Sequence, residues 1–134
     1  MRLSGKTLLS TAAVGLVTFG VVAPAFAGSR SGTTSNWTDG DTSSSWSDPG
    51  KNGAITSVTF YKGCKHDFDA RIRQEHFGPD STTGSERINC TSYQDTVYGG
   101  DLDDGGYHFD VHGYYLTGGY IVYPKLSGNY LIKW

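Results

Sequence analysis

The stretch that decides the fold is residues 107–134, with the sequence YHFDVHGYYLTGGYIVYPKLSGNYLIKW. Its first residues alternate between apolar and polar side chains, so that Tyr107, Phe109 and Val111 share one face of a strand. A strand with one face on the core and the other face in solvent has this pattern. The first residues of the stretch are therefore predicted to form a half-buried strand of an antiparallel sheet.

The remainder of the stretch predicts two turns and two more strands. Thr-Gly-Gly at 117–119 and Ser-Gly-Asn at 127–129 are typical of turns. The β-branched and aromatic runs 120–123 and 130–134 are typical of strands. We therefore expect a three-stranded antiparallel meander that ends at the last residue.

Alternation of apolar and polar residues continues upstream. Strands are predicted over residues 54–61, within 66–77, and at 87–90 and 93–98, whereas 78–84 has the composition of a polar loop. A short helix is the alternative for 66–77, because Ala, Arg, Gln and Glu favour helix. The residues expected to face the core in the first two of these strands are Thr56, Val58, Phe60, Phe68, Ala70 and Ile72. Many short strands separated by turns predict an all-β fold, either a small antiparallel β-sandwich or an open barrel.

The first 27 residues have the pattern of a secretory signal peptide. Arg2 and Lys6 precede an apolar run over residues 8–22, and Ala-Phe-Ala at 25–27 is a typical cleavage site. The apolar run has about 15 residues, fewer than the roughly 20 that a membrane-spanning helix needs. The sequence thus predicts a secreted, extracellular protein that begins at Gly28.

Net charge and cysteine content narrow the range of functions that the protein could have. All 13 acidic residues lie after residue 27, whereas two of the 11 basic residues lie before it, so the mature chain is acidic. Nucleic-acid and anionic-membrane binding usually need a basic face, and neither is expected here. In an oxidising compartment, Cys64 and Cys90 are expected to form one disulfide, which would stabilise the fold by roughly 3 kcal/mol.

Residues 28–53 differ from the rest of the mature chain. They are rich in Ser, Thr, Gly and Asp, which predicts a flexible Ser/Gly/Trp arm ahead of a β-domain over residues 54–134. This segment contains Trp37 and Trp46, and linkers rarely carry tryptophan. Either these rings fold back over the core, or they anchor a partner protein from an extended arm. We list both as candidate partner-binding residues.

Tyrosine is also abundant, with nine in the whole chain. Consecutive residues of a strand point to opposite faces, so Tyr114 and Tyr115 place one ring on each face. An exposed tyrosine offers a large contact area with few rotamers and a polar tip. The alternative is that the outer rings only pack across neighbouring strands. Tyr114 and Tyr115 complete the set of candidate partner-binding residues.

Two patterns raise the question of a metal site or an active site. His108, Asp110 and His112 fall on one strand face, but no fourth ligand is identifiable, so we expect a solvated strand face and no metal or other cofactor. The order Glu75, Arg87, His108 resembles small secreted guanyl-specific ribonucleases, in which a Glu base, phosphate-binding Arg residues and a His acid lie on a sheet. The sequence departs from that family because it lacks the helical segment and has Glu86 beside Arg87. No catalytic residue is therefore assigned.

In size, signal peptide, arm and Tyr-rich β-domain, the chain resembles the small adaptor subunit of the umbrella toxin particles secreted by actinomycetes. The resemblance rests on the segment GSRSGTTSNWTDGDTSSSW and the single cysteine pair. It implies a non-enzymatic adaptor that joins a protease-like subunit to a large repeat-containing toxin chain. The arm would enter a cleft of one partner and the β-domain would hold the other.

A second binding function also fits the sequence. Lys62-Gly63-Cys64-Lys65 places basic residues next to a disulfide, as in the exposed loop of an inhibitor of trypsin-like proteases. The sequence therefore predicts a secreted protein-binding adaptor, with a protease inhibitor or a small ribonuclease as alternatives.

Overall fold

The computed structural model describes residues 26–134, so residues 1–25 of the predicted signal peptide lie outside the described residues. No helix among the described residues is long and apolar enough to cross a membrane. Residues 26–134 form ten strands: β1 (Ser29–Trp37), β2 (Trp46–Asp48), β3 (Thr56–Gly63), β4 (Phe68–Gln74), β5 (Ser81–Ile88), β6 (Gln94–Gly100), β7 (Gly105–His112), β8 (Tyr114–Tyr115), β9 (Ile121–Val122) and β10 (Leu126–Lys133).

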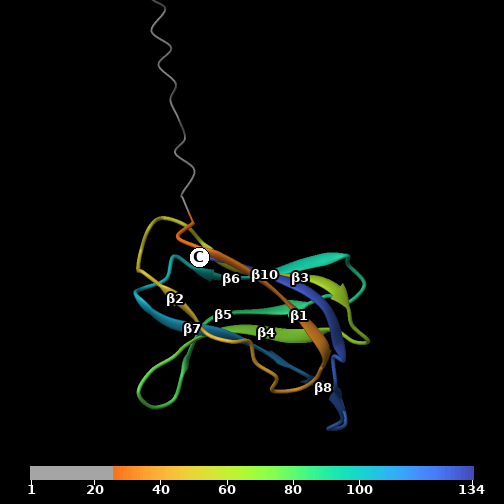
Figure 1. The fold of residues 1–134 in the computed structure, drawn as a ribbon. Helices are drawn as coiled ribbons and strands as arrows, with labels where there is room; N and C mark the ends of the chain where they lie inside the picture. Colours follow the sequence, from red (N-terminus) through yellow and green to blue (C-terminus); the bar gives the residue numbers. More distant parts are fainter. Residues whose placement is uncertain (1–25) are drawn as a thin grey trace, which may run out of the picture.

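Two four-stranded sheets pack face to face (Figure 1). The first has the strand order β1-β10-β3-β6 and the second has the order β2-β7-β4-β5, and all strand pairs are antiparallel. β8 and β9 form a separate two-stranded hairpin. The predicted all-β sandwich is therefore confirmed.

The core fills the space between the sheets, and the alternation read from the sequence identifies much of it. Tyr107, Phe109 and Val111 of β7 are fully buried, and Phe109 meets the rings of Phe60 and Tyr130 edge-on at 5.4 and 4.9 Å between centroids. The six residues expected to face inward from β3 and β4 are buried as well: Thr56, Val58, Phe60, Phe68, Ala70 and Ile72.

The predicted C-terminal meander is wrong. β7 lies in one sheet and β10 in the other, so the two strands do not pair. Residues 127–129, expected to be a turn, lie inside β10, where Gly128 pairs with Thr34 of β1 and with Lys62 of β3. A strand on each side of β10 satisfies its backbone hydrogen-bonding groups, and this pairing outweighs the local preference for a turn. The polar loop expected at 78–84 also ends early, because β5 begins at Ser81.

Residues 28–53 are part of the sandwich and not a separate flexible arm. Gly28 and Trp134 exchange two backbone hydrogen bonds of 2.9 and 3.0 Å, and β1 continues this pairing along β10. β2 pairs with β7, and the intervening segment bonds to the edge of β7 through Gly40 and Ser43. Ordering this segment costs conformational entropy, which its polar side chains cannot offset. Backbone pairing and the burial of the two tryptophans together offset that cost.

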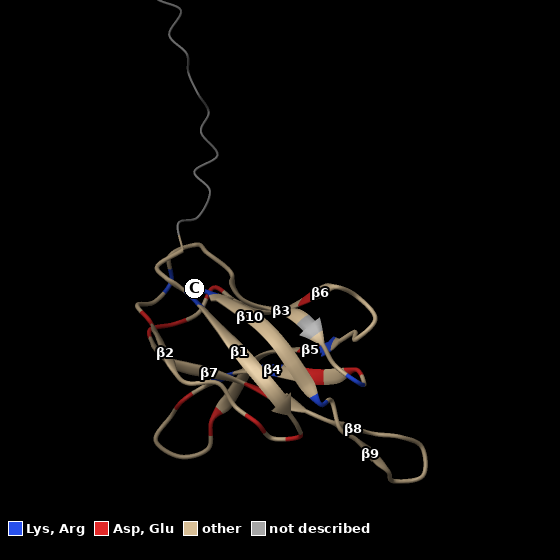
Figure 2. Ribbon diagram, turned by 45° about the vertical axis from the view of Figure 1, so that its right-hand side comes forward, with Lys and Arg blue, Asp and Glu red and all other residues tan. Residues whose placement is uncertain are grey.

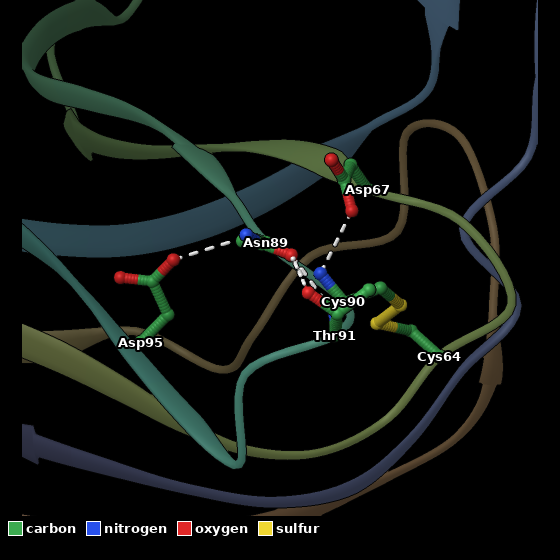
Figure 3. The surroundings of a disulfide bond; sticks show 6 residues. All are labelled: Cys64, Asp67, Asn89, Cys90, Thr91 and Asp95. Atoms are coloured by element: carbon green, nitrogen blue, oxygen red, sulfur yellow. Dashed lines mark hydrogen bonds between the residues drawn. A yellow bond between two sulfur atoms is a disulfide. The ribbon is translucent and has the colours of Figure 1, made fainter.

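The disulfide between Cys64 and Cys90 is confirmed (Figure 3), with a Cα–Cα distance of 5.6 Å. Cys64 directly follows β3 and Cys90 lies two residues after β5, so the bond joins the two sheets. Asp67 accepts a hydrogen bond of 2.8 Å from the backbone N–H of Cys90 and holds this corner in place. A disulfide is typical of proteins from oxidising compartments, which agrees with an extracellular protein.

Candidate functional site

The β8–β9 hairpin carries the largest group of exposed apolar and aromatic side chains. Tyr115, Leu116, Tyr120 and Tyr123 are 73, 50, 74 and 49% exposed. The hairpin extends beyond the end of the sandwich (Figure 2), and its turn is closed by a hydrogen bond of 2.8 Å from the N–H of Leu116 to the carbonyl of Tyr120. Its two strands are too short to bury these rings against each other, so the rings remain available for contact.

The base of the hairpin is fixed to the sandwich at three points. The N–H of Gly113 donates to the Asp39 carboxylate over 2.9 Å, and the N–H of Lys65 donates to the carbonyl of Pro124 over 2.9 Å. The guanidinium of Arg87 lies over the ring of Tyr114, 4.1 Å from its centroid. The hairpin is therefore presented in a defined direction, which lowers the entropy lost on binding.

Of the two tyrosines predicted to bind a partner, Tyr115 is exposed and Tyr114 is half-buried under Arg87. Leu116, Tyr120 and Tyr123 are further exposed residues that the sequence interpretation did not single out. The sequence signal for their exposure is the pair Gly118-Gly119, which interrupts an apolar run. The strands on either side of these glycines are then too short to take part in the core.

One side of the hairpin borders a hollow of about 320 Å³ with an apolar floor and basic walls. Leu116, Val122 and Tyr123 supply the apolar surface, while Lys65 and Lys125 supply positive charge. His66 also lines it. Although residues 28–134 carry more acidic than basic side chains, this is a local basic surface with an apolar centre.

The outer face of β4 and β7 carries a network of charged side chains. Asp110 is buried, and its carboxylate lies 2.8 Å from Nε2 of His112 and 3.4 Å from Nε of Arg71. Asp69 binds the guanidinium of Arg87 through both carboxylate oxygens, and this hydrogen bonding raises the pKa of Arg87 above its ordinary value. The groups hold one another in fixed positions.

His108, Asp110 and His112 lie on one strand face as predicted, but they do not converge on a common point. Nδ1 of His108 is 3.1 Å from Glu75, and its Nε2 is 3.8 Å from Asp80. His112 instead contacts Asp110 and Asp39. Within residues 26–134 no three His, Cys, Asp or Glu side chains are placed to hold a metal ion.

The ribonuclease-like trio is only partly assembled. Glu75 and His108 are in contact, and the hydroxyl of Ser45 also donates to Glu75. Arg87 pairs with Asp69 at the start of β4, six residues from Glu75, which corresponds to roughly 20 Å along a strand. The arginine predicted to bind a phosphate therefore lies away from the carboxylate and the imidazole.

Trp37 and Trp46, the other predicted partner-binding residues, face the core. Trp46 is 4% exposed and stacks on Tyr107 and Trp134 with ring centroids 6.1 Å apart in both cases. Trp37 is half-buried, with its ring 5.7 Å from that of Phe109. The interpretation in which these rings fold back over the core is the one that the structure supports, and an extended arm anchored by them is not present.

The segment proposed as an inhibitory loop is held by strand pairing. β3 extends through Gly63, which is in register with Ser127 of β10, and the N–H of Lys65 is bonded to Pro124. Lys62 and Gly63 therefore lie within β3, whereas Cys64 and Lys65 belong to the short connection between β3 and β4, which the bond to Pro124 and the disulfide hold in place.

Comparisons with protein-family models, with curated proteins and with solved structures find no match for this chain, so its function has to be argued from the geometry described above.

Proposed function

We propose that this protein is a secreted, non-enzymatic binding protein that holds another extracellular protein through its β8–β9 hairpin. The observation that carries the proposal is the group of four exposed side chains, Tyr115, Leu116, Tyr120 and Tyr123, on one projecting hairpin. Aromatic residues of this kind dominate the energetics of protein interfaces. The signal-peptide pattern and the disulfide support an extracellular location.

The hollow beside the hairpin indicates the chemistry of the partner. Its apolar floor, formed in part by Leu116 and Tyr123, suits an apolar anchor residue. Lys65 and Lys125 at its rim favour acidic side chains around that anchor, because complementary charges raise the rate of association and fix the orientation. The partner is therefore expected to present an apolar residue flanked by Asp or Glu.

An adaptor between subunits of an extracellular toxin or antibacterial assembly would need a second contact surface. β1 is the outermost strand of its sheet, and its outward side chains include Ser31 and Thr33. An edge strand of this kind offers unpaired backbone groups to a strand from another chain. The hairpin and the β1 edge together would allow one small domain to join two proteins.

The test is affinity capture from the culture supernatant of the producing organism, with the mature protein as bait and identification of the retained proteins by mass spectrometry. The double variant Leu116→Ser, Tyr123→Ala removes the floor of the hollow, and Tyr98→Ala on β6, 64% exposed, is the matched control. We expect a discrete secreted protein in a fixed ratio to the bait, with at least a tenfold weaker affinity for the double variant.

Retention of the same proteins by the wild type and the double variant would overturn the proposal, as would the absence of any retained protein. Deletion of residues 28–53 is not a suitable variant, because it removes β1 and β2 and with them part of the core.

Ribonuclease activity is a second candidate, favoured by the 3.1 Å contact between Glu75 and His108. Cleavage of RNA by the wild type that is lost in His108→Ala would support it. Protein capture by the hairpin does not depend on His108, so the two functions are tested separately.

A further inference from the structure

A second hollow lies at the hairpin base, over the charged outer face of β4, β5 and β7. It has a volume of about 370 Å³, at the small end of the range for small-molecule sites. Asp39, from the β1–β2 connection, forms one wall, and the hairpin forms another. The lining residues used below are Asp39, Asp69, Arg71, Ser85, His112 and Tyr115.

The charges around this hollow largely balance one another. The carboxylate of Asp69 is bound by Arg87, and that of Asp39 accepts a hydrogen bond from Gly113 and lies 3.5 Å from His112. A strongly charged ligand, such as a phosphate or a polyamine, would find little uncompensated charge of the opposite sign. The site instead suits a ligand that is neutral overall and polar.

Hydrogen-bonding capacity remains open at the floor. Among the described residues, the side chains of Ser85 and Arg71 make no hydrogen bond, although Arg71 lies within ion-pair distance of Asp110. The two residues are directly opposite each other on β4 and β5. Carboxylate oxygens of Asp39 and Asp69 are close by as acceptors. The floor therefore offers donors and acceptors side by side, and its charged groups are positioned by existing ion pairs.

The ring of Tyr115 stands beside this polar floor and is 73% exposed. A pyranose ring has hydroxyl groups that both donate and accept hydrogen bonds, and an apolar C–H face that packs against an aromatic ring. A polar floor with balanced charges next to one exposed aromatic wall matches these two features of a sugar.

We propose that this hollow binds a neutral saccharide, with Arg71, Ser85 and Asp39 on its hydroxyl groups and Tyr115 against its apolar face. The two hollows share Ile121, so the saccharide site adjoins the protein-docking hollow, which is lined by Leu116 and Tyr123. The protein would thus bind a glycan and a protein at adjoining surfaces of one hairpin.

The test is a microarray that carries neutral mono- to tetrasaccharides of hexoses and N-acetylhexosamines, together with sialylated and sulfated glycans. The neutral glycan that binds best is then titrated into the protein by calorimetry. Ser85→Ala and Tyr115→Ala change exposed positions and are expected to preserve the fold. We expect at least a tenfold loss of glycan affinity in Tyr115→Ala, a smaller loss in Ser85→Ala, and no change in the control Tyr98→Ala.

Three outcomes would each overturn the proposal. The protein could bind no neutral glycan, it could prefer the sialylated or sulfated glycans, or all variants could bind with equal affinity. Ser85→Ala is expected to leave protein capture unchanged, because Ser85 does not line the docking hollow. Failure of glycan binding and failure of protein binding are therefore distinguishable.

Discussion

Two segments of this protein both carry candidate aromatic contact residues but have opposite roles in the structure. Residues 28–53 carry Trp37 and Trp46 in a polar sequence, and both rings turn toward the core. Residues 114–123 carry four exposed aromatic or aliphatic side chains on a short hairpin that extends into solvent. The sequence suggested the same partner-binding role for both.

The difference lies in the strand partners that each segment finds. β1 and β2 each pair with a strand of a four-stranded sheet, which brings their inward side chains over the core. β8 and β9 pair only with each other, so neither face of the hairpin lies on the core. An aromatic residue in a polar segment is thus a core residue or a contact residue according to the pairing of its backbone.

The largest expected effect that separates the two segments is on stability. Trp46→Ala removes a ring that is 4% exposed and stacked on Tyr107 and Trp134, and we expect a loss of about 3–5 kcal/mol in the free energy of unfolding. Urea denaturation followed by circular dichroism measures it. A loss below about 1 kcal/mol would mean that residues 28–53 are not an integral part of the fold.

An intermediate effect concerns Tyr107, which stacks on Trp46 and donates a hydrogen bond of 2.7 Å to the carbonyl of Asp103. Burial, followed by the nearby carboxylates of Asp48 and Asp103, raises the pKa of Tyr107 above its ordinary value of 10.0. The folded state therefore favours the protonated phenol. This contribution to stability is complete below about pH 10 and is lost as the pH rises through the folded-state pKa.

Tyr107→Phe isolates this contribution. At neutral pH the variant should be less stable than the wild type by about 1 kcal/mol, because one hydrogen bond is lost. The difference in unfolding free energy should shrink between about pH 9 and pH 11, because only the wild type has this phenol to ionise. A difference that stays constant over this range would contradict the raised pKa.

The smallest expected effect is in the hairpin. Tyr120 is 74% exposed, and its side chain lines neither hollow beside the hairpin, so Tyr120→Ala should change the unfolding free energy by less than about 0.5 kcal/mol. The same urea denaturation experiment measures it alongside Trp46→Ala. A loss comparable to that of Trp46→Ala would show that the hairpin is part of the cooperative core.

Much of the fold follows from local alternation. The inward faces of β3, β4 and β7 are predictable because each strand alternates over several residues, with apolar or β-branched side chains at every second position. The alternation does not predict β1, because the inward positions of this strand are Gly32 and Thr34. In addition, a β-bulge before Trp37, with Asn36 at φ 52°, interrupts the alternation and turns the indole inward.

The candidate sites were predicted less completely. Strand parity alone placed His108, Asp110 and His112 on one face and Tyr114 and Tyr115 on opposite faces, but it did not say which tyrosine is exposed. The two hollows depend on which segments meet there: one forms between the hairpin and Lys65, the other between the hairpin, Asp39 and the floor of β4 and β5. Contacts between residues far apart in the chain leave no periodic signal in a single sequence.

The sequence by itself determined the all-β class, the disulfide between Cys64 and Cys90 and the core-facing side of the main strands, because a period of two and a single cysteine pair are local or unambiguous signals. Only the tertiary structure decided which strands pair. It placed β7 and β10 in different sheets, drew residues 28–53 into the sandwich and left the β8–β9 hairpin projecting. Backbone hydrogen bonds can form between strands of almost any sequence, so they do not by themselves select a partner. Strand pairing is therefore determined by the burial of side chains in the whole fold and not by the segment alone.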